Sequence, residues 1–142
     1  MSFYNREIEC MPREQIRELQ SERLVAQVAR MYERVECFRN RMDAKGLKPS
    51  DIHGVEDLHL IPFSYKSDLR DYYPYGLFAE PLSNIVRVHA SSGTTGKRIV
   101  VGYTQNDLEI WAECVARIMN GLGMDDASIV QVADGYGLFT GG

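Results

Sequence analysis

The chain has 142 residues, of which 44% are hydrophobic and 25% are charged, and its formal net charge is −4. This composition is typical of a globular protein and argues against intrinsic disorder. The 16 basic residues are spread among 20 acidic ones, so no basic stripe forms and we expect no nucleic-acid partner. The sequence has neither an apolar run long enough to span a membrane nor the apolar core of a signal peptide near its start. We therefore expect a cytoplasmic protein with no membrane partner.

The cysteines and histidines do not form a metal-binding pattern. Cys10, Cys37 and Cys114 lie too far apart for a Cys-x-x-Cys motif, and their odd number does not suit a disulfide framework. The 3 histidines offer no pair at i and i+4. We expect free thiols and no metal site.

Residues 12–45 have the apolar periodicity of a helical region. Pro12 suits a first helical turn, and apolar residues recur at spacings of three and four, namely Ile16, Leu19, Val25, Val28, Met31, Tyr32 and Val35. Gly46, Pro49 and Gly54 then break the pattern. The Arg and Glu residues in between are typical of a solvated face. We assign this region a structural role, with docking of a partner or second subunit as the alternative.

Residues 47–83 are rich in proline, which predicts loops. Within them, residues 64–71 predict a short helix with Ser64 as its N-cap, and we expect Asp68 and Arg70 to support that helix. Lys66, judged from its chemistry alone, is a surface lysine.

The segment 91–97 has the composition of a phosphate-binding loop, Ser91-Ser92-Gly93-Thr94-Thr95-Gly96-Lys97. Glycines let successive backbone N–H groups turn toward one anion, the hydroxyls are further donors, and Lys97 adds positive charge. Apolar runs at 85–88 and 99–101 predict a strand on each side. A polar hairpin turn that binds nothing is the alternative, but the density of hydroxyls together with a lysine favours phosphate.

The spacing of this loop excludes a Walker-type nucleotide site. Only two residues separate Gly93 from Gly96, and Arg98 stands where Ser or Thr would follow the lysine. A strand is predicted after the loop, whereas a Walker loop opens into a helix.

A helix is predicted after the second strand. Thr104 and Asp107 have the spacing of a capping box, and one apolar stripe follows, namely Leu108, Trp111, Ala112, Val115, Ile118, Met119 and Leu122. Two glycines mark its end. We expect Trp111 to lie in the core, and residues 128–132 to form a buried strand.

Residues 136–142 combine glycines with the aromatic side chains of Tyr136 and Phe139. The glycines could serve tight strand-to-helix packing. Alternatively, they could let a flat aromatic acid approach the backbone while the two rings contact it.

Three segments together resemble the phenylacetate–coenzyme A ligase family of adenylate-forming enzymes. They are the loop 91–97, residues 61–70 with 73–78, and residues 135–142. The resemblance extends over nearly the whole chain. It implies an α/β fold in which an amino-terminal helical region with a loop-rich connection (1–83) precedes the start of the nucleotide-binding α/β domain (84–142).

By this resemblance, the chain is the amino-terminal piece of an AMP-forming ligase that uses ATP, Mg²⁺ and coenzyme A to activate an aryl acid. The loop Ser91–Lys97 would bind the ATP phosphates, Lys66 would be a catalytic residue, and Tyr136, Gly137 and Phe139 would line the aryl-acid pocket. The catalytic carboxy-terminal domain would lie outside this chain. We therefore expect the piece to be inactive alone and able to form homo-oligomers through surfaces that the missing part would cover.

The chain departs from the family pattern at three positions. Asp134 stands just before Gly135-Tyr136-Gly137, where the family tends to have an uncharged residue, and its carboxylate would be unfavourable near an anionic substrate unless it faces away. Glu36 stands where the family usually has a proline, which leaves open whether residues 12–45 form one helix or two. Arg98 also replaces a usual proline and adds a second cation beside the loop. The alternative function is a non-catalytic chain, either a truncated paralogue or a helical interaction module that keeps the loop as a relic.

Overall fold

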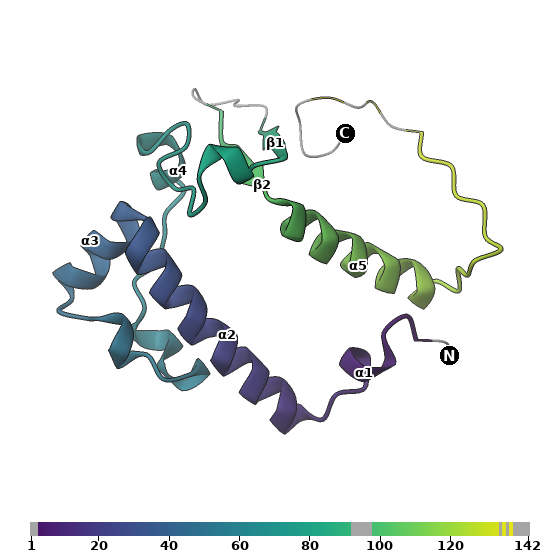
Figure 1. Cartoon of the computed structure of the whole chain (residues 1–142), viewed down its shortest axis with the longest axis horizontal. Coiled ribbons are helices and arrows are strands. Elements are labelled where there is room, and N and C mark those ends of the chain that lie inside the picture. Colours follow the sequence, from purple (N-terminus) through teal and green to yellow (C-terminus); the bar gives the residue numbers. More distant parts are fainter. Residues whose placement is uncertain (1–2, 92–97, 134, 136, 138–142) are drawn as a thin grey trace.

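The computed structural model describes residues 3–91, 98–133, 135 and 137. A helical layer comes first and a two-stranded sheet with a long helix follows (Figure 1). The elements are α1 (Arg6–Glu9), α2 (Arg13–Arg34), α3 (Glu36–Ala44), the 3-10 helices η1 (Pro49–Asp51) and η2 (Val55–Leu60), α4 (Asp68–Asp71), the 3-10 helix η3 (Leu82–Asn84), β1 (Arg87–Ala90), β2 (Val100–Tyr103) and α5 (Gln105–Gly121). Among the described residues, no helix is long and apolar enough to cross a membrane.

A single extended residue separates α2 from α3. Val35 has φ −116° and ψ 103°, and only 1% of its surface is exposed. The predicted helical region 12–45 is therefore two helices, and the break needs no proline, because burial of the valine side chain fixes the extended backbone. Glu36 begins α3.

The hydrophobic core lies between α2, α3 and the two 3-10 helices that follow them. Val28, Met42 and Ile52 are buried at its centre. Partly buried side chains surround them, namely Leu24, Tyr32, Phe38, Leu47, Leu60 and Ile61. Because α2 contributes only one stripe, its charged face stays in solvent, as the sequence pattern predicted.

The middle of the chain is more helical than the sequence predicted, and its short α-helix begins later. Helix α4 starts at Asp68, after the N-cap Ser67, whose side chain makes no capping bond. The prediction of Ser64 as the cap is therefore wrong. The Asp68 carboxylate instead accepts the backbone N–H of Tyr65 at 2.7 Å, which closes the turn before the helix.

The two predicted strands are confirmed and form an antiparallel hairpin. Arg87 pairs with Tyr103 and Ala90 pairs with Val100. The ladder continues beyond the strand ends, because Val86 donates to the Tyr103 carbonyl and Ser91 donates to the Ile99 carbonyl, both at 2.9 Å.

Helix α5 begins with the predicted capping box. The Thr104 hydroxyl accepts the N–H of Asp107, and the Asp107 carboxylate accepts the N–H of Thr104 at 2.8 Å. Its apolar stripe is less buried than predicted: no residue of α5 is fully buried, and Trp111 is 38% exposed. The Trp111 ring nevertheless packs against a side chain from each strand, 5.9 Å from the ring of His89 on β1 and 5.4 Å from that of Tyr103 on β2.

The predicted strand at 128–132 is wrong for this structure. These residues have no regular secondary structure, and Ile129 is 98% exposed. A strand is stable only when neighbouring strands satisfy its backbone groups, and within the described residues the only sheet is the β1–β2 hairpin.

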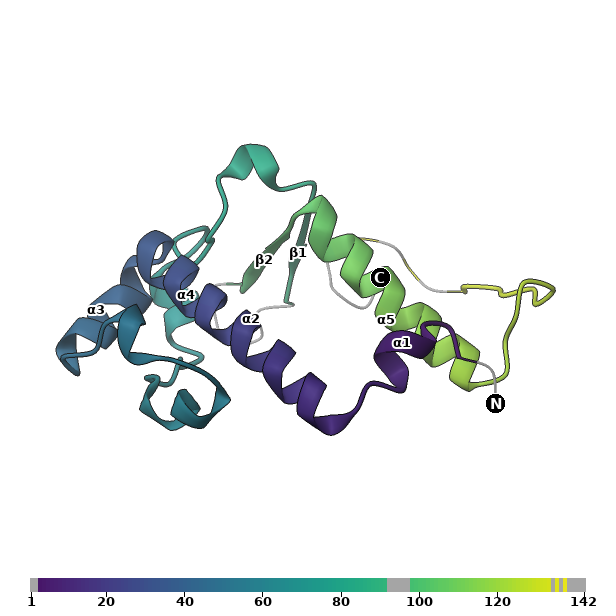
Figure 2. The same ribbon diagram turned by 60° about the horizontal axis from the view of Figure 1, so that its bottom comes forward.

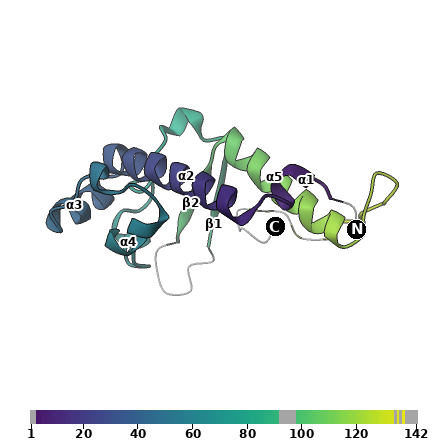
Figure 3. The same ribbon diagram turned by 90° about the horizontal axis from the view of Figure 1, so that it is seen from below.

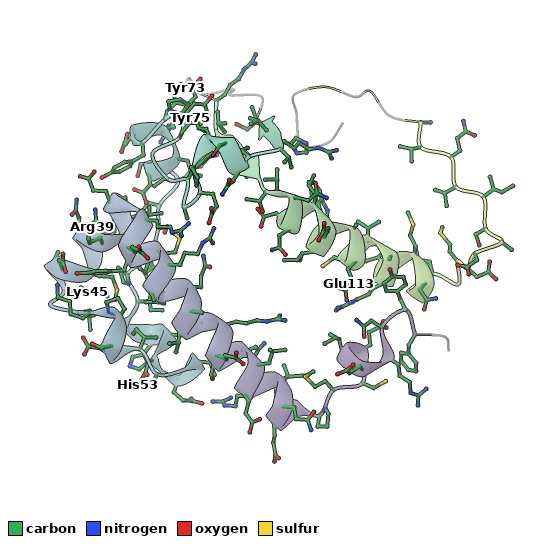
Figure 4. All side chains as sticks on the ribbon, viewed as in Figure 1. Arg39, Lys45, His53, Tyr73, Tyr75 and Glu113 are labelled. Carbon is green, nitrogen blue, oxygen red and sulfur yellow. The ribbon has the colours of Figure 1, made fainter. Side chains whose placement is uncertain are left out.

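The helices α2 and α5 lie apart from each other, and the hairpin lies near the start of α5 (Figures 1 and 2). The amino-terminal segment with α1 lies beside the far end of α5, also when seen from below (Figure 3). A hydrogen bond joins them: Asn5 Nδ2 donates to Glu113 Oε1 at 3.0 Å. Figure 4 shows Glu113 on the side of α5 that faces α1.

Candidate functional site

The predicted phosphate-binding segment connects the two strands of the hairpin. The structure describes its first residue, Ser91, where the backbone pairing ends. The Ser91 hydroxyl oxygen accepts the N–H of Ile99 at 3.1 Å. This bond links the two chain segments at the point where the loop begins. The hydroxyl hydrogen can still be donated to another acceptor, such as a phosphate oxygen. Ser92, Gly93, Thr94, Thr95, Gly96 and Lys97 lie outside the described residues.

A cluster of charged residues fastens the start of the hairpin to α2. Glu80 Oε1 accepts from Arg30 Nη2 at 2.9 Å and from Arg34 Nη1 at 2.8 Å, while Glu80 Oε2 accepts from Asn84 at 3.1 Å. These hydrogen bonds, that of Arg30 foremost, lower the pKa of the Glu80 carboxyl. The segment leading into β1 is therefore bound to α2 through Glu80 and the two arginines, while Asn84 holds the Glu80 carboxylate from within the same segment.

Lys66 lies at the edge of a cavity of about 450 Å³ between the α2–α3 junction and α4. The walls are mainly apolar, from Met31, Val35, Phe38, Pro62, Leu69 and Leu77. The polar groups at the cavity include Arg41 and the buried thiol of Cys37. Lys66 itself is exposed, as its chemistry alone predicted, and it makes no ion pair with the described residues.

An ion pair between α3 and α4 holds the backbone around Lys66. Arg41 Nη1 donates to Asp68 Oδ2 at 2.6 Å, and Nη2 donates to Oδ1 at 2.5 Å. The Arg41 guanidinium, and secondly the N–H of Tyr65, lower the pKa of the Asp68 carboxyl. Sequence reasoning missed Arg41, because it lies 27 residues from Asp68 and no local motif links the two.

Two leucines, Leu69 of α4 and Leu77, lie between the Lys66 region and β2, the strand that follows the loop. Leu69 and Leu77 line the large cavity together with Lys66. The same two leucines line a second cavity, of about 210 Å³, together with Val100 and Val101 of β2. The Lys66 region and β2 therefore border two cavities that share these leucines as lining residues.

The predicted aryl-acid pocket lies largely outside the described residues. Tyr136 and Phe139 are among the residues that are not described. Gly137 is described and is exposed, and a Cβ at this position would meet no atom within 4 Å among the described residues. The close approach of another group to this glycine thus stays a prediction.

The described residues contain no group of three or more His, Cys, Asp or Glu side chains that could hold a metal ion. The three cysteines are free thiols, as predicted.

Comparison with known proteins shows that the chain is similar to one segment of several CoA ligases. It is 54% identical over 140 residues to the phenylacetate-coenzyme A ligase of Thermus thermophilus, and 50% and 47% identical over 135 residues to those of Aromatoleum evansii and Escherichia coli. These alignments cover 95–99% of this chain but only 31–32% of each relative. No protein-family model matches the chain.

The fold agrees with the sequence comparison. A crystal structure of 2-hydroxyisobutyryl-CoA ligase in complex with 2-HIB-AMP and CoA matches 80% of this chain at a TM-score of 0.73 and 30% identity, and this chain covers 25% of it. An open conformation of the same enzyme matches at a TM-score of 0.70. The predicted α/β fold class is confirmed. Over its own length, the chain therefore resembles a segment of phenylacetate-coenzyme A ligases in sequence and a segment of 2-hydroxyisobutyryl-CoA ligase in fold, and it spans about a third of the length of the former.

Proposed function

We propose that this chain is the amino-terminal part of an AMP-forming phenylacetate–coenzyme A ligase and carries the phosphate-binding elements of that enzyme. The observation that supports this most is the near-complete coverage of the chain by phenylacetate-coenzyme A ligases at 47–54% identity. Residues 1–83 would form the helical region, and residues 84–142 the start of the nucleotide-binding domain. Completing the site would require the remaining part of such an enzyme, so the segment alone would be inactive.

The reaction has two half-reactions. A carboxylate is a poor acylating agent, so one of its oxygens first attacks the α-phosphorus of ATP, and pyrophosphate leaves. The sulfur of coenzyme A then attacks the carbonyl carbon of the acyl-adenylate. The thiol proton is released, AMP leaves with the bonding electron pair, and the thioester forms.

The loop Ser91–Lys97 would hold the β- and γ-phosphates during the first half-reaction. Negative charge grows on the leaving pyrophosphate, and donors fixed in advance stabilise it without reorganisation. The hairpin suits this task, because β-pairing fixes the strands on both sides of the loop, and the hydrogen bond from Ile99 N–H to the Ser91 hydroxyl links the two segments where the loop begins.

Lys66 would place an ammonium against a phosphate or carboxylate oxygen. Tyr136, Gly137 and Phe139 would contact the aryl acid. Coenzyme A would bind in the second half-reaction, and both ATP and coenzyme A are available in the cytoplasm, where we expect the protein to act.

Mg²⁺ would reach the site with ATP and offset phosphate charge. The described residues supply no ligand cluster for it, so no step is assigned to a metal held by this chain.

The test begins with the gene. The reading frame beyond Gly142 should continue into ligase sequence, and its complete product should catalyse phenylacetate-dependent exchange of pyrophosphate into ATP. In that enzyme, Lys97→Ala should raise the KM for ATP and slow adenylation by about 100-fold.

Lys45→Ala is the matched control, because it removes the same charge at the end of α3, where Lys45 Nζ donates to the Leu60 carbonyl. A complete product without exchange activity would favour a non-catalytic paralogue or interaction module. An unchanged rate in Lys97→Ala would remove this lysine from the site.

A further inference from the structure

The Arg41 side chain holds the backbone on both sides of Lys66. Its Nη1 donates to the Phe63 carbonyl at 3.0 Å, and its two terminal nitrogens bind both oxygens of Asp68. Asp68 in turn accepts the N–H of Tyr65 at 2.7 Å. Residues 63, 65 and 68 are therefore fixed to one guanidinium on α3.

The Asp68 side of the pair is buried, whereas the Arg41 side chain is 30% exposed. Only 5% of the Asp68 surface is exposed, so water cannot replace Arg41 as its partner without rearrangement. The planar guanidinium matches the two carboxylate oxygens, an arrangement that a lysine cannot reproduce. The Tyr65 ring lies 5.3 Å from the Arg41 guanidinium carbon and packs against its outer side.

Arg41 also keeps the Asp68 carboxylate from competing for Lys66. Both oxygens of Asp68 are occupied by Arg41, and one of them also by Tyr65. Without Arg41, the Asp68 carboxylate, two positions from Lys66 in the sequence, would lack its cationic partner and could compete for the lysine ammonium.

We propose that Arg41 and Asp68 are positioning residues for Lys66: they fix its backbone at the edge of the cavity and leave its ammonium free for an anionic substrate group. This inference rests on the proposed role of Lys66 in the ligase. Positioning matters here because a lysine has a flexible stem, so its reach depends on where the backbone begins, and misplacement by about 1 Å can cost about 100-fold in rate.

The experiment is a double-mutant cycle in the complete ligase. Asp68→Asn, Lys66→Ala and the double variant are compared by phenylacetate-dependent ATP–pyrophosphate exchange, with kcat and the KM for ATP determined separately. Lys66→Ala should slow exchange by about 100-fold, and Asp68→Asn by about tenfold. The double variant should be within about twofold of Lys66→Ala, because Asp68 acts only through the lysine.

The melting temperature separates positioning from stability. Asp68→Asn should lower it by the same amount whether residue 66 is lysine or alanine, whereas the rate effect should appear only with lysine. Glu113→Gln is the matched control, since it breaks the Arg117–Glu113 ion pair on α5 and should leave the exchange rate unchanged. If the Asp68→Asn protein does not fold, Arg41→Lys replaces it in the cycle. This substitution keeps a positive charge beside Asp68 but removes the paired hydrogen bonds of the guanidinium.

The outcomes are distinct. Rate losses that multiply in the double variant, or an Asp68→Asn enzyme as fast as wild type, would overturn the positioning role while leaving the ligase function intact. Full activity in Lys66→Ala would overturn the role of Lys66, and the inference with it. Absence of exchange in the wild-type enzyme would overturn the proposed function itself.

Discussion

The Asp68 carboxylate is buried, yet it can stay charged. Both of its oxygens accept hydrogen bonds from the Arg41 guanidinium, and one of them also accepts the N–H of Tyr65. These bonds favour the ionised form, so the pKa in the folded protein lies below the ordinary aspartate value. A carboxyl group whose pKa is lowered by folding stabilises the folded state at neutral pH, and this contribution disappears as the group becomes protonated.

Asp68→Asn should therefore lower the free energy of unfolding at neutral pH, and the loss should shrink in acid. The contribution of the wild-type carboxylate is complete above the unfolded-state pKa of about 3.9 and is lost as the pH falls below that value toward the folded-state pKa. Urea unfolding of both proteins between neutral pH and pH of about 3 measures this difference. Asp71→Asn, at an exposed position on the same helix, should show almost none. A loss that stays constant down to the lowest pH would contradict the assignment.

At the residue scale, the sequence indicates which side chains are exposed or support a helix, but it does not indicate which side chains they bind. Lys66 was predicted to be at the surface and is exposed. Asp68 was expected to support its own short helix, and it does so through Tyr65, but its stronger partner, Arg41, lies on another helix. Apolar periodicity shows which face of a helix is packed, but it does not show which polar side chains on two distant segments come together.

At the scale of elements, short sequence motifs predict a helix or strand correctly where contacts between residues close in sequence stabilise it. The capping box of α5 is confirmed, as are the two strands flanking the loop. The segment 128–132 was predicted wrongly, because strand formation needs a neighbouring strand that the apolar pattern does not supply. The sequence alone does not decide whether residues 12–45 form one helix or two. The break lies at Val35, whose burial depends on contacts with residues elsewhere in the fold.

The packing of β2 depends on a glycine. A Cβ at Gly102 would lie 2.7 Å from Phe78 Cζ and 3.1 Å from Ile85 Cγ2. Gly102→Ala should destabilise the fold by about 1–3 kcal/mol, as overpacked positions do, measured by chemical denaturation. Gly121→Ala is the matched control, because a Cβ there meets nothing within 4 Å of the described atoms and alanine favours the helix.

Relief of the clash gives a second check on Gly102. Phe78→Leu removes the ring atoms that the new Cβ would meet, so it should recover part of the stability lost in Gly102→Ala. A Gly102→Ala protein as stable as wild type would show that the Phe78 ring moves aside freely.

At the scale of the whole molecule, the chain exposes apolar surface that an ordinary monomer would bury. Helix α5 exposes Ile110 and Ile118, its C-cap residue Leu122 is also exposed, and the exposed residues Ile129, Val130 and Val132 follow. Leu108, Trp111, Val115 and Met119 also line an open groove along α5. Contiguous exposed apolar patches mark surfaces that other protein segments cover, and the relatives are about three times as long as this chain.

The isolated 142-residue chain should therefore self-associate through α5. Ile118 is 63% exposed and Leu122 is 72% exposed, and burying such side chains gains about 1.5–3 kcal/mol each. Introducing Ile118→Glu with Leu122→Lys should weaken association by tenfold or more, about 1.4 kcal/mol, in sedimentation velocity over a concentration series. Gln15→Lys with Gln20→Glu places the same two charges at exposed positions of α2 and should leave association unchanged. Equal association of both double variants would show that α5 is not the contact surface, because only one of them alters its apolar face.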